Sequence, residues 1–286
     1  MRYVALLLML LSAVAAAGAN TLAVEAVISP AWVEHASGVR EPLAPGLILR
    51  DGDRVLTGPG ARVLLRMAEG SAVKLGENAR LGVDRLTDNA SAADRLVSGV
   101  LDVVQGAFRF TTRVFGTPRA RRDINIRIVT VTAGIRGTDV WGKSSAERDV
   151  VCLIEGRVFV QHQEQAFTMQ DPLSFFVAGR DGTRQPVATV APAQLQQWAT
   201  ETEIAPAGGA SRRDGPHRVV LAAAVEEAAA LALGNRLRAD GYPARLRAYR
   251  AASGLRYDVH IAGLAGDEDA ATLAGALRSA GYAPLR

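Results

Sequence analysis

From Leu22 to about Gly182 the chain alternates apolar and polar residues in short runs that Gly, Asp and Pro separate. Successive side chains of a strand point to opposite faces, so a period of two predicts many short strands that each bury one face. In one such run Ile124, Ile126 and Ile128 alternate with an Asn and an Arg. The pattern predicts an all-β domain and leaves open whether its strands form a roll, a solenoid or a sandwich.

Glycine marks the expected turns between these runs. Glu69-Gly70 turns the chain between two alternating runs, and Glu155-Gly156 separates the runs at residues 150–154 and 157–161. Because glycine adopts positive φ without steric cost, the second pair predicts a β-hairpin with Gly156 in its turn.

Composition limits the classes of protein to which the chain can belong. It has 286 residues, of which 49% are hydrophobic and 22% charged, enough for two packed domains and too apolar for a disordered tail. The net charge of +4 is modest and does not predict nucleic-acid binding. The single cysteine, Cys152, lies in the apolar run VVCLIEGRVFV and is expected to be a buried small hydrophobe.

Residues 1–19 are typical of a signal peptide. Met1 and Arg2 give a positive start, an apolar stretch runs to Ala17, and small residues precede Asn20. The stretch is shorter than the roughly 20 residues that cross a bilayer, so cleavage is expected and an uncleaved anchor is the alternative. We therefore expect a periplasmic protein with no transmembrane helix in the mature chain.

A helix and a connector are expected after the strands. Leu195, Trp198 and Thr202 lie at helical spacing, which predicts a closing helix near residues 192–204 that packs its Trp on the strands. Residues 205–216, APAGGASRRDGP, predict a flexible linker because Gly, Pro and charge leave little to bury. The β domain would then occupy residues 20–204 and a second domain residues 217–286.

The second domain contains an internal repeat. LGNRLRADGYPARLR from Leu233 is echoed by LAGALRSAGYAPLR from Leu273, so each half is expected to be a helix that ends at a Gly-Tyr corner before a strand. Strands starting near Arg218 and Tyr257 would precede the two helices, which gives the order β-α-β-β-α-β. The sequence predicts an α+β domain with two helices on one face of a four-stranded antiparallel sheet and the other face open.

This second domain resembles the SPOR domain family. The resemblance rests on its length, the duplicated helix, and the strand at residues 257–261 followed by Gly263. It implies a fold of this topology that binds peptidoglycan glycan strands stripped of their stem peptides, often at the division septum. Where the family commonly has a polar residue on its first strand, this chain has Val219-Val220-Leu221.

The β domain resembles the FecR domain family, which is named after periplasmic regulators of iron-transport signalling. Five motifs occur in the family's order: GDRVLTG from Gly52, AEGS from Ala68, GAFRF from Gly106, GIRGTD from Gly134 and EGRV from Glu155. The regulators carry a cytoplasmic sigma-factor-binding segment and a membrane helix before this domain, and we expect neither here. The resemblance implies an all-β envelope module over residues 46 to about 182, with a ligand that it does not identify.

Alternation in the second domain predicts a polar group on the open face of its sheet. Val259 and Ile261 are expected to face the helices, and the residues beside them the open side. The predicted glycan-binding residues are Arg245, Arg247, Tyr249, Asp258 and His260. Arginine supplies paired hydrogen-bond donors, Asp and His supply acceptors, and Tyr supplies an aromatic face against which a sugar can pack. The alternative is that they only solvate an exposed sheet.

Arginines also gather around the sequence GTPRARR in the β domain. They are Arg113, Arg119, Arg121, Arg122 and Arg127. We expect them at the tip and flanks of a hairpin or loop, where they could contact an anionic partner or be solvated only.

No catalytic constellation is found in the sequence. The four histidines are scattered, and neither HExxH nor Gly-x-Ser-x-Gly occurs, so no zinc site or serine triad is predicted. We expect no metal, no cofactor and no enzymatic activity.

Three hypotheses for function remain. The first is a non-catalytic periplasmic adaptor whose SPOR-like domain binds peptidoglycan glycan strands while the FecR-like domain acts as a scaffold or binds an envelope or divisome protein. The second is an envelope sensor or regulatory protein related to FecR-type signalling. The third is a glycan-cleaving enzyme. Nucleic acid is not an expected partner of any of them.

Overall fold

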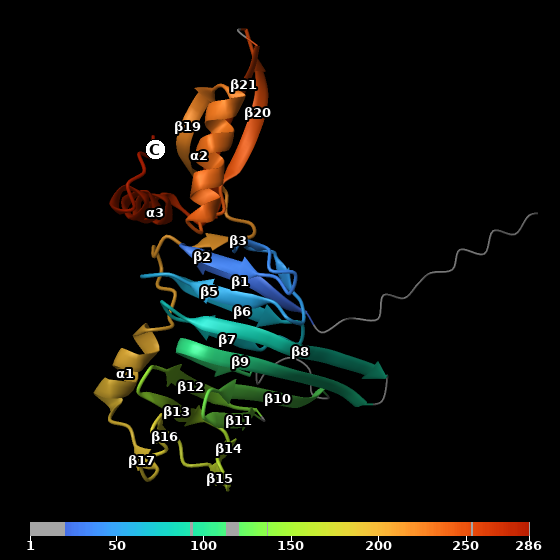
Figure 1. Cartoon of the computed structure of the whole chain (residues 1–286), viewed down its shortest axis with the longest axis vertical. Helices are drawn as coiled ribbons and strands as arrows, with labels where there is room; N and C mark the ends of the chain where they lie inside the picture. Colours follow the sequence, from blue (N-terminus) through green and yellow to red (C-terminus); the bar gives the residue numbers. More distant parts are fainter. Residues whose placement is uncertain (1–20, 92–93, 113–119, 136, 253, 286) are drawn as a thin grey trace, which may run out of the picture.

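The computed structural model describes residues 21–91, 94–112, 120–135, 137–252 and 254–285 (Figure 1). The predicted signal peptide, residues 1–19, lies outside the described residues. Strands cross the long axis of an elongated molecule, and a smaller part with two helices lies at one end (Figure 1). Within the described part of the chain, no helix is both long and apolar enough to cross a membrane.

The β part consists of two sheets, and the chain passes repeatedly from one to the other. Sheet A contains β1 (Leu22–Ile28), β4 (Ile48–Leu49), β6 (Arg62–Met67), β7 (Ala72–Leu75), the end of β9 (Asp94–Thr111), β12 (Asp139–Ser144), β13 (Arg148–Glu155), β16 (Ser174–Gly179) and β17 (Ala188–Thr189). Sheet B contains β2 (Ala31–Glu34), β3 (Arg40–Pro42), β5 (Arg54–Thr57), β8 (Arg80–Ser91), the start of β9, β10 (Ala120–Ile128), β11 (Val131–Ile135), β14 (Val158–His162) and β15 (Gln165–Met169).

One hydrophobic core lies between the two sheets. Leu65 and Phe108 enter it from sheet A, while Ile124, Ile126 and Ile128 enter it from sheet B. The all-β prediction is confirmed, and the shared core corresponds to the sandwich among the three architectures that the sequence left open.

The hairpin predicted at Glu155-Gly156 is wrong. β13 pairs with β12 and β16 in sheet A, whereas β14 pairs with β11 and β15 in sheet B, so the chain changes sheet at this turn. β13 is buried on both faces, which removes the alternation that would identify its partner. Gly156 does have positive φ, at 92°, and a Cβ there would lie 2.4 Å from the carbonyl oxygen of Gly137.

The closing helix is confirmed as α1 (Pro192–Thr200), which ends four residues earlier than predicted. Its Trp198 stacks on Trp141 with ring centroids 4.7 Å apart. The same small cluster on the outer side of sheet A contains Cys152, which is buried as predicted. Burial raises the pKa of the Cys152 thiol to about 12, so this thiol is protonated at neutral pH.

The arginine-rich segment does not connect a hairpin. Residues 113–119 lie outside the described residues, but β9 and β10 on either side of them pair in parallel. A parallel pair needs a crossover connection in place of a tight turn. Arg127 lies on β10 and forms ion pairs with Asp102 and Asp84 at 2.5 and 2.7 Å.

The predicted flexible linker is packed against both parts of the molecule. Ser211–Arg212 forms β18, which pairs with β1 and meets β21 (Gly254–Leu264) at one position. Ala210 and Ser211 are buried, and the Gly209 amide donates to the Asp269 carboxylate at 2.9 Å. Alanine and serine pack here because a neighbouring strand offers hydrogen bonds, which composition does not reveal.

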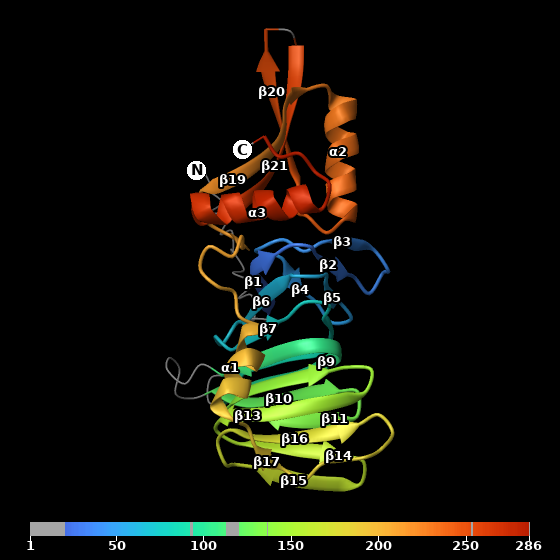
Figure 2. The ribbon, with the colours of Figure 1, turned by 90° about the vertical axis from the view of Figure 1, so that its left-hand side faces the viewer.

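The C-terminal part follows the predicted order up to its last element. β19 (His217–Val225), α2 (Glu227–Ala239), β20 (Arg245–Ala251), β21 and α3 (Asp267–Ser279) form a sheet ordered β20-β21-β19, with helices that pack through one core (Figure 2). Leu237, Leu273 and Leu277 are buried in it. The fourth strand is not formed in the described residues, where Leu285 makes a single backbone hydrogen bond to Val220.

The C-terminal part packs directly on the end of sheet B. The Trp32 indole on β2 donates to the carbonyl of Ala239 at 3.0 Å, and the Ala31 amide donates to Gly241 at 3.1 Å. Gly241 has φ 83°, and a Cβ there would lie 2.6 Å from the Trp32 ring. Close backbone approach therefore joins the two parts at this point.

The turn at Gly156 provides a test of the sheet change. Gly156→Ala should lower the free energy of unfolding by more than about 1 kcal/mol, because alanine is strained at positive φ and its Cβ would clash with Gly137. Gly275→Ala in α3, where a Cβ would meet nothing within 4 Å, is the control and should be neutral or stabilising. Urea unfolding measures both, and an unchanged Gly156→Ala variant would contradict the described turn.

His35 makes stability depend on pH in the β part. Its Nε2 lies 3.1 Å from Glu41 and its Nδ1 lies 2.9 Å from the buried Asp53, and these contacts raise the His35 pKa above its usual 6.5. The stabilisation is present below pH 6.5 and lost as pH rises through the raised value. The difference in unfolding free energy between wild type and His35→Gln should therefore be larger at pH 5.5 than at pH 8.5.

Glu41→Gln tests the same contact from the other side. Because Glu41 is the largest cause of the raised His35 pKa, this variant should show a smaller change in stability between the two pH values. Urea unfolding measures these free energies. If wild type and His35→Gln differ in unfolding free energy by the same amount at pH 5.5 and pH 8.5, His35 gains no proton affinity on folding.

Candidate functional site

The five predicted site residues lie together on the face of the C-terminal sheet that the helices leave uncovered. Arg245 on β20 lies opposite His260 on β21, and Arg247 lies opposite Asp258. Directly opposed residues of antiparallel strands point to the same face, and Tyr249 follows Arg247 by two positions. The intervening Val259 and Ile261 are buried against the helices. We call the outward group the tail face; its role in glycan binding stays a prediction.

Arg218 on β19 belongs to the tail face and was missed from the sequence. It pairs with Ala262, which follows His260 by two positions on β21, and it is exposed. Alternation contained the signal, because Arg218 precedes the buried Val219. The apolar run that follows, VVLAAAV, hides this alternation.

Electrostatics on the tail face keep His260 neutral. Partial burial and the neighbouring Arg218, Arg245 and Arg247 all lower the His260 pKa below its usual 6.5, and Asp258 only partly opposes them. At neutral pH this imidazole therefore has one nitrogen that can accept a hydrogen bond and one that can donate. The tail face therefore combines guanidinium donors with an uncharged hydrogen-bond acceptor.

Asp258 also has a structural contact. Its Oδ1 accepts a hydrogen bond from the Ala224 amide at 3.1 Å, where Ala224 has positive φ and β19 departs from regular pairing with β21. This contact fixes the end of β19 and leaves the second carboxylate oxygen for a ligand. Removing Asp258 would therefore change both the strand and the face.

The tail face is suited to binding. It offers guanidinium groups that donate hydrogen bonds, a neutral imidazole, one carboxylate and the Tyr249 ring, on a surface that three strands hold in place. These groups can form hydrogen bonds with the hydroxyls, amides and carboxylates of a bound polymer. Across the described ranges, no group of three or more His, Cys, Asp or Glu side chains is arranged to hold a metal ion.

The motifs quoted for the β domain hold its strands and turns together. Arg109 of GAFRF forms a two-pronged ion pair with Asp139 of GIRGTD, at 2.9 and 2.6 Å. The Thr138 hydroxyl of the same motif donates to the carbonyl of Arg157 in EGRV at 2.7 Å. The contacts join segments distant in sequence, so these residues serve the fold of the domain.

Comparison with known proteins identifies part of this chain. Residues 53–159 match the family model described as FecR protein, and the match does not extend to the C-terminal part. The search of curated proteins gave no match. Two solved structures of a putative anti-sigma factor from Parabacteroides distasonis ATCC 8503 are similar to parts of the chain.

The structural similarities are distant. The first has a TM-score of 0.41 at 13% identity and covers 51% of this chain and 63% of that chain, so this protein spans less than two thirds of it. The second has a TM-score of 0.39 at 12% identity and covers 71% of this chain and 97% of that chain. The family match and the motif contacts agree on one assignment: residues 53–159 of this chain form a FecR domain.

Proposed function

We propose that this chain is a non-catalytic binding protein of the cell envelope. The tail face would bind glycan strands of peptidoglycan that lack stem peptides, and the FecR domain would act as a scaffold or hold an envelope or divisome protein. The observation that carries the proposal is the register of β20 and β21, which gathers the polar side chains opposite the helix-covered face. The SPOR-like repeat of the sequence supports the choice of ligand.

The chemistry of such a strand matches the groups on the tail face. A glycan freed of its peptides carries hydroxyls, acetamido groups and free carboxylates. Arg245 and Arg247 would donate to carboxylates and carbonyls, and the neutral His260 would accept from hydroxyls. The Tyr249 ring would lie against sugar C–H groups.

A regulatory role is the second candidate, and the FecR match favours it. In this case the FecR domain would contact an envelope sensor or receptor, and the tail face would localise the protein at the wall. Both candidates place the mature protein in the periplasm and predict binding without turnover.

Removing two guanidinium groups from the tail face tests the proposed function. Arg245→Ala/Arg247→Ala in the full chain should weaken co-sedimentation with amidase-treated sacculi by at least about tenfold, because charge-assisted hydrogen bonds to the glycan are lost. The thermal midpoint should be unchanged, since both side chains are exposed.

The matched control is Arg250→Ala/Arg278→Ala, which removes two exposed arginines of the same part outside the tail face. It should sediment as wild type does. Full binding by the Arg245→Ala/Arg247→Ala variant would contradict glycan binding by the tail face. Release of reducing sugar by wild type would contradict the proposal that the protein is non-catalytic.

A further inference from the structure

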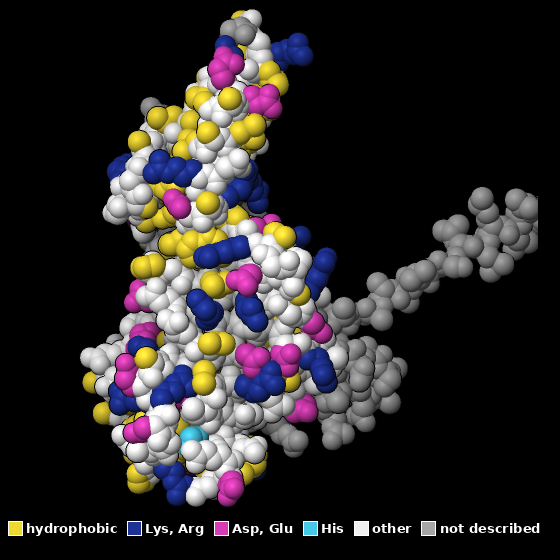
Figure 3. Space-filling view, viewed as in Figure 1, with side chains coloured by type: hydrophobic (Ala, Val, Ile, Leu, Met, Phe, Trp, Pro, Cys, Tyr) yellow, Lys and Arg dark blue, Asp and Glu magenta, His cyan; other side chains and the backbone are white. Residues whose placement is uncertain are grey.

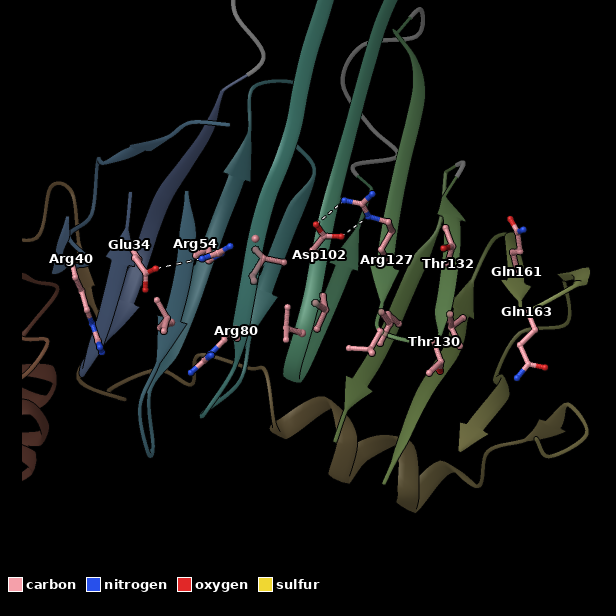
Figure 4. A pocket seen from close by; sticks show the side chains of 18 residues that line it. Glu34, Arg40, Arg54, Arg80, Asp102, Arg127, Thr130, Thr132, Gln161 and Gln163 are labelled. Carbon is pink, nitrogen blue, oxygen red and sulfur yellow. Dashed lines mark hydrogen bonds and ion pairs between the residues drawn. The ribbon is translucent and has the colours of Figure 1, made fainter. Parts of the chain in front are cut away.

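A straight row of polar side chains crosses the outer face of sheet B (Figure 4). Each neighbouring strand contributes one residue at the same register, so the row runs perpendicular to the strands. We call this set the transverse row. In the order of the strands, its side chains are those of Arg40, Glu34, Arg54, Asp102, Arg127, Thr132 and Gln161.

The row lies in a hollow of about 840 Å³. Gly82 on β8 occupies the register position between Arg54 and Asp102 and contributes no side chain. Its φ lies outside the left-handed region, and a Cβ there would meet only Asp102, at an ordinary 3.5 Å. The backbone therefore does not require glycine at this position, and the missing side chain keeps the row open.

Positive charge is concentrated at one end of the hollow. Arg54 lies 3.5 Å from Glu34 with its side chain 64% exposed, and Arg40 lies over the Trp32 ring at 4.4 Å. No carboxylate of the described residues lies within ion-pair distance of Arg40 or Arg80. This end therefore has guanidinium groups that are free to bind an anion.

The other end of the hollow is neutral and polar. Arg127 is held by Asp102 and Asp84. Beyond it the hollow is lined by the polar side chains of Thr130, Thr132, Gln161 and Gln163 together with the exposed Val129 (Figure 4). A ligand that complements both ends carries anionic groups together with many hydroxyls or amides. Figure 3 likewise shows basic and acidic side chains interspersed on the face of the β part in view.

We infer that the transverse row is a binding site for a linear, carboxylate-bearing glycan. None of the residues that line the hollow is aromatic, so affinity for a neutral sugar by ring stacking is not provided. An extended peptide would gain no backbone hydrogen bonds from this face, because the backbone groups of sheet B are already paired between its strands. Glycan hydroxyls that face away from the sheet stay hydrated at no cost. This site is separate from the tail face and does not depend on it.

Titration calorimetry with oligogalacturonate tests the inference. The background is the full chain with Arg245→Ala/Arg247→Ala, so that the tail face does not contribute. We expect binding that weakens as salt is raised, and no binding of a maltooligosaccharide of the same length. Arg54→Gln/Arg80→Gln should weaken it by about tenfold or more.

Gly82→Val provides a variant that blocks the site without removing charge. It should abolish binding while the thermal midpoint stays equal or rises, because valine is favourable in a strand. The control Arg148→Gln/Arg184→Gln removes two exposed arginines that do not line the hollow and should bind as the background does.

Three results would overturn the inference. The first is no binding of oligogalacturonate. The second is unchanged binding by both Arg54→Gln/Arg80→Gln and Gly82→Val. The third is tighter binding of hexaglutamate than of oligogalacturonate, which would indicate an acidic peptide as the ligand.

Discussion

Burial of every second side chain against sheet A holds the strands of sheet B in register. A slip of one residue would move Ile124, Ile126 and Ile128 from the core to solvent, which costs on the order of 1.5–3 kcal/mol for each side chain. The same register fixes which residues point outward. The transverse row is therefore a consequence of core packing, and its straightness follows from pairing without shifts between β9, β10, β11 and β14.

The same argument applies to the C-terminal sheet, with helices in place of a second sheet. Val259 and Ile261 are buried against α2 and α3, so Asp258 and His260 must face away from them. The two outward faces belong to one molecule whose parts are joined by backbone contacts at Ala31 and Gly241. A ligand on the tail face would thus be held in a defined position relative to the FecR domain, in contrast to a tether on a free linker.

Periodicity predicted those parts of the structure in which one face of an element is buried. It identified the β domain, the closing helix with Trp198, and the placement of Arg245, Arg247, Tyr249, Asp258 and His260 on one face. It failed at β13, which is buried on both faces. Composition failed at residues 205–216, where a neighbouring strand supplies hydrogen bonds. The transverse row was not predicted, because its members come from strands whose pairing order is set by the tertiary fold. Arg127 was noticed only as one of several basic residues near a loop.

The register of sheet B determines which side chains face outward, and cross-linking measures this register. In a Cys152→Ser background, cysteines at Thr132 and Gln161 lie opposite each other on β11 and β14, at a Cα separation of about 4.5–5.5 Å that a disulfide spans. The described register predicts that this pair closes under mild oxidation, while the pair Thr132→Cys/Val160→Cys, whose side chains point to opposite faces, stays reduced. Closure of the second pair and not the first would contradict it.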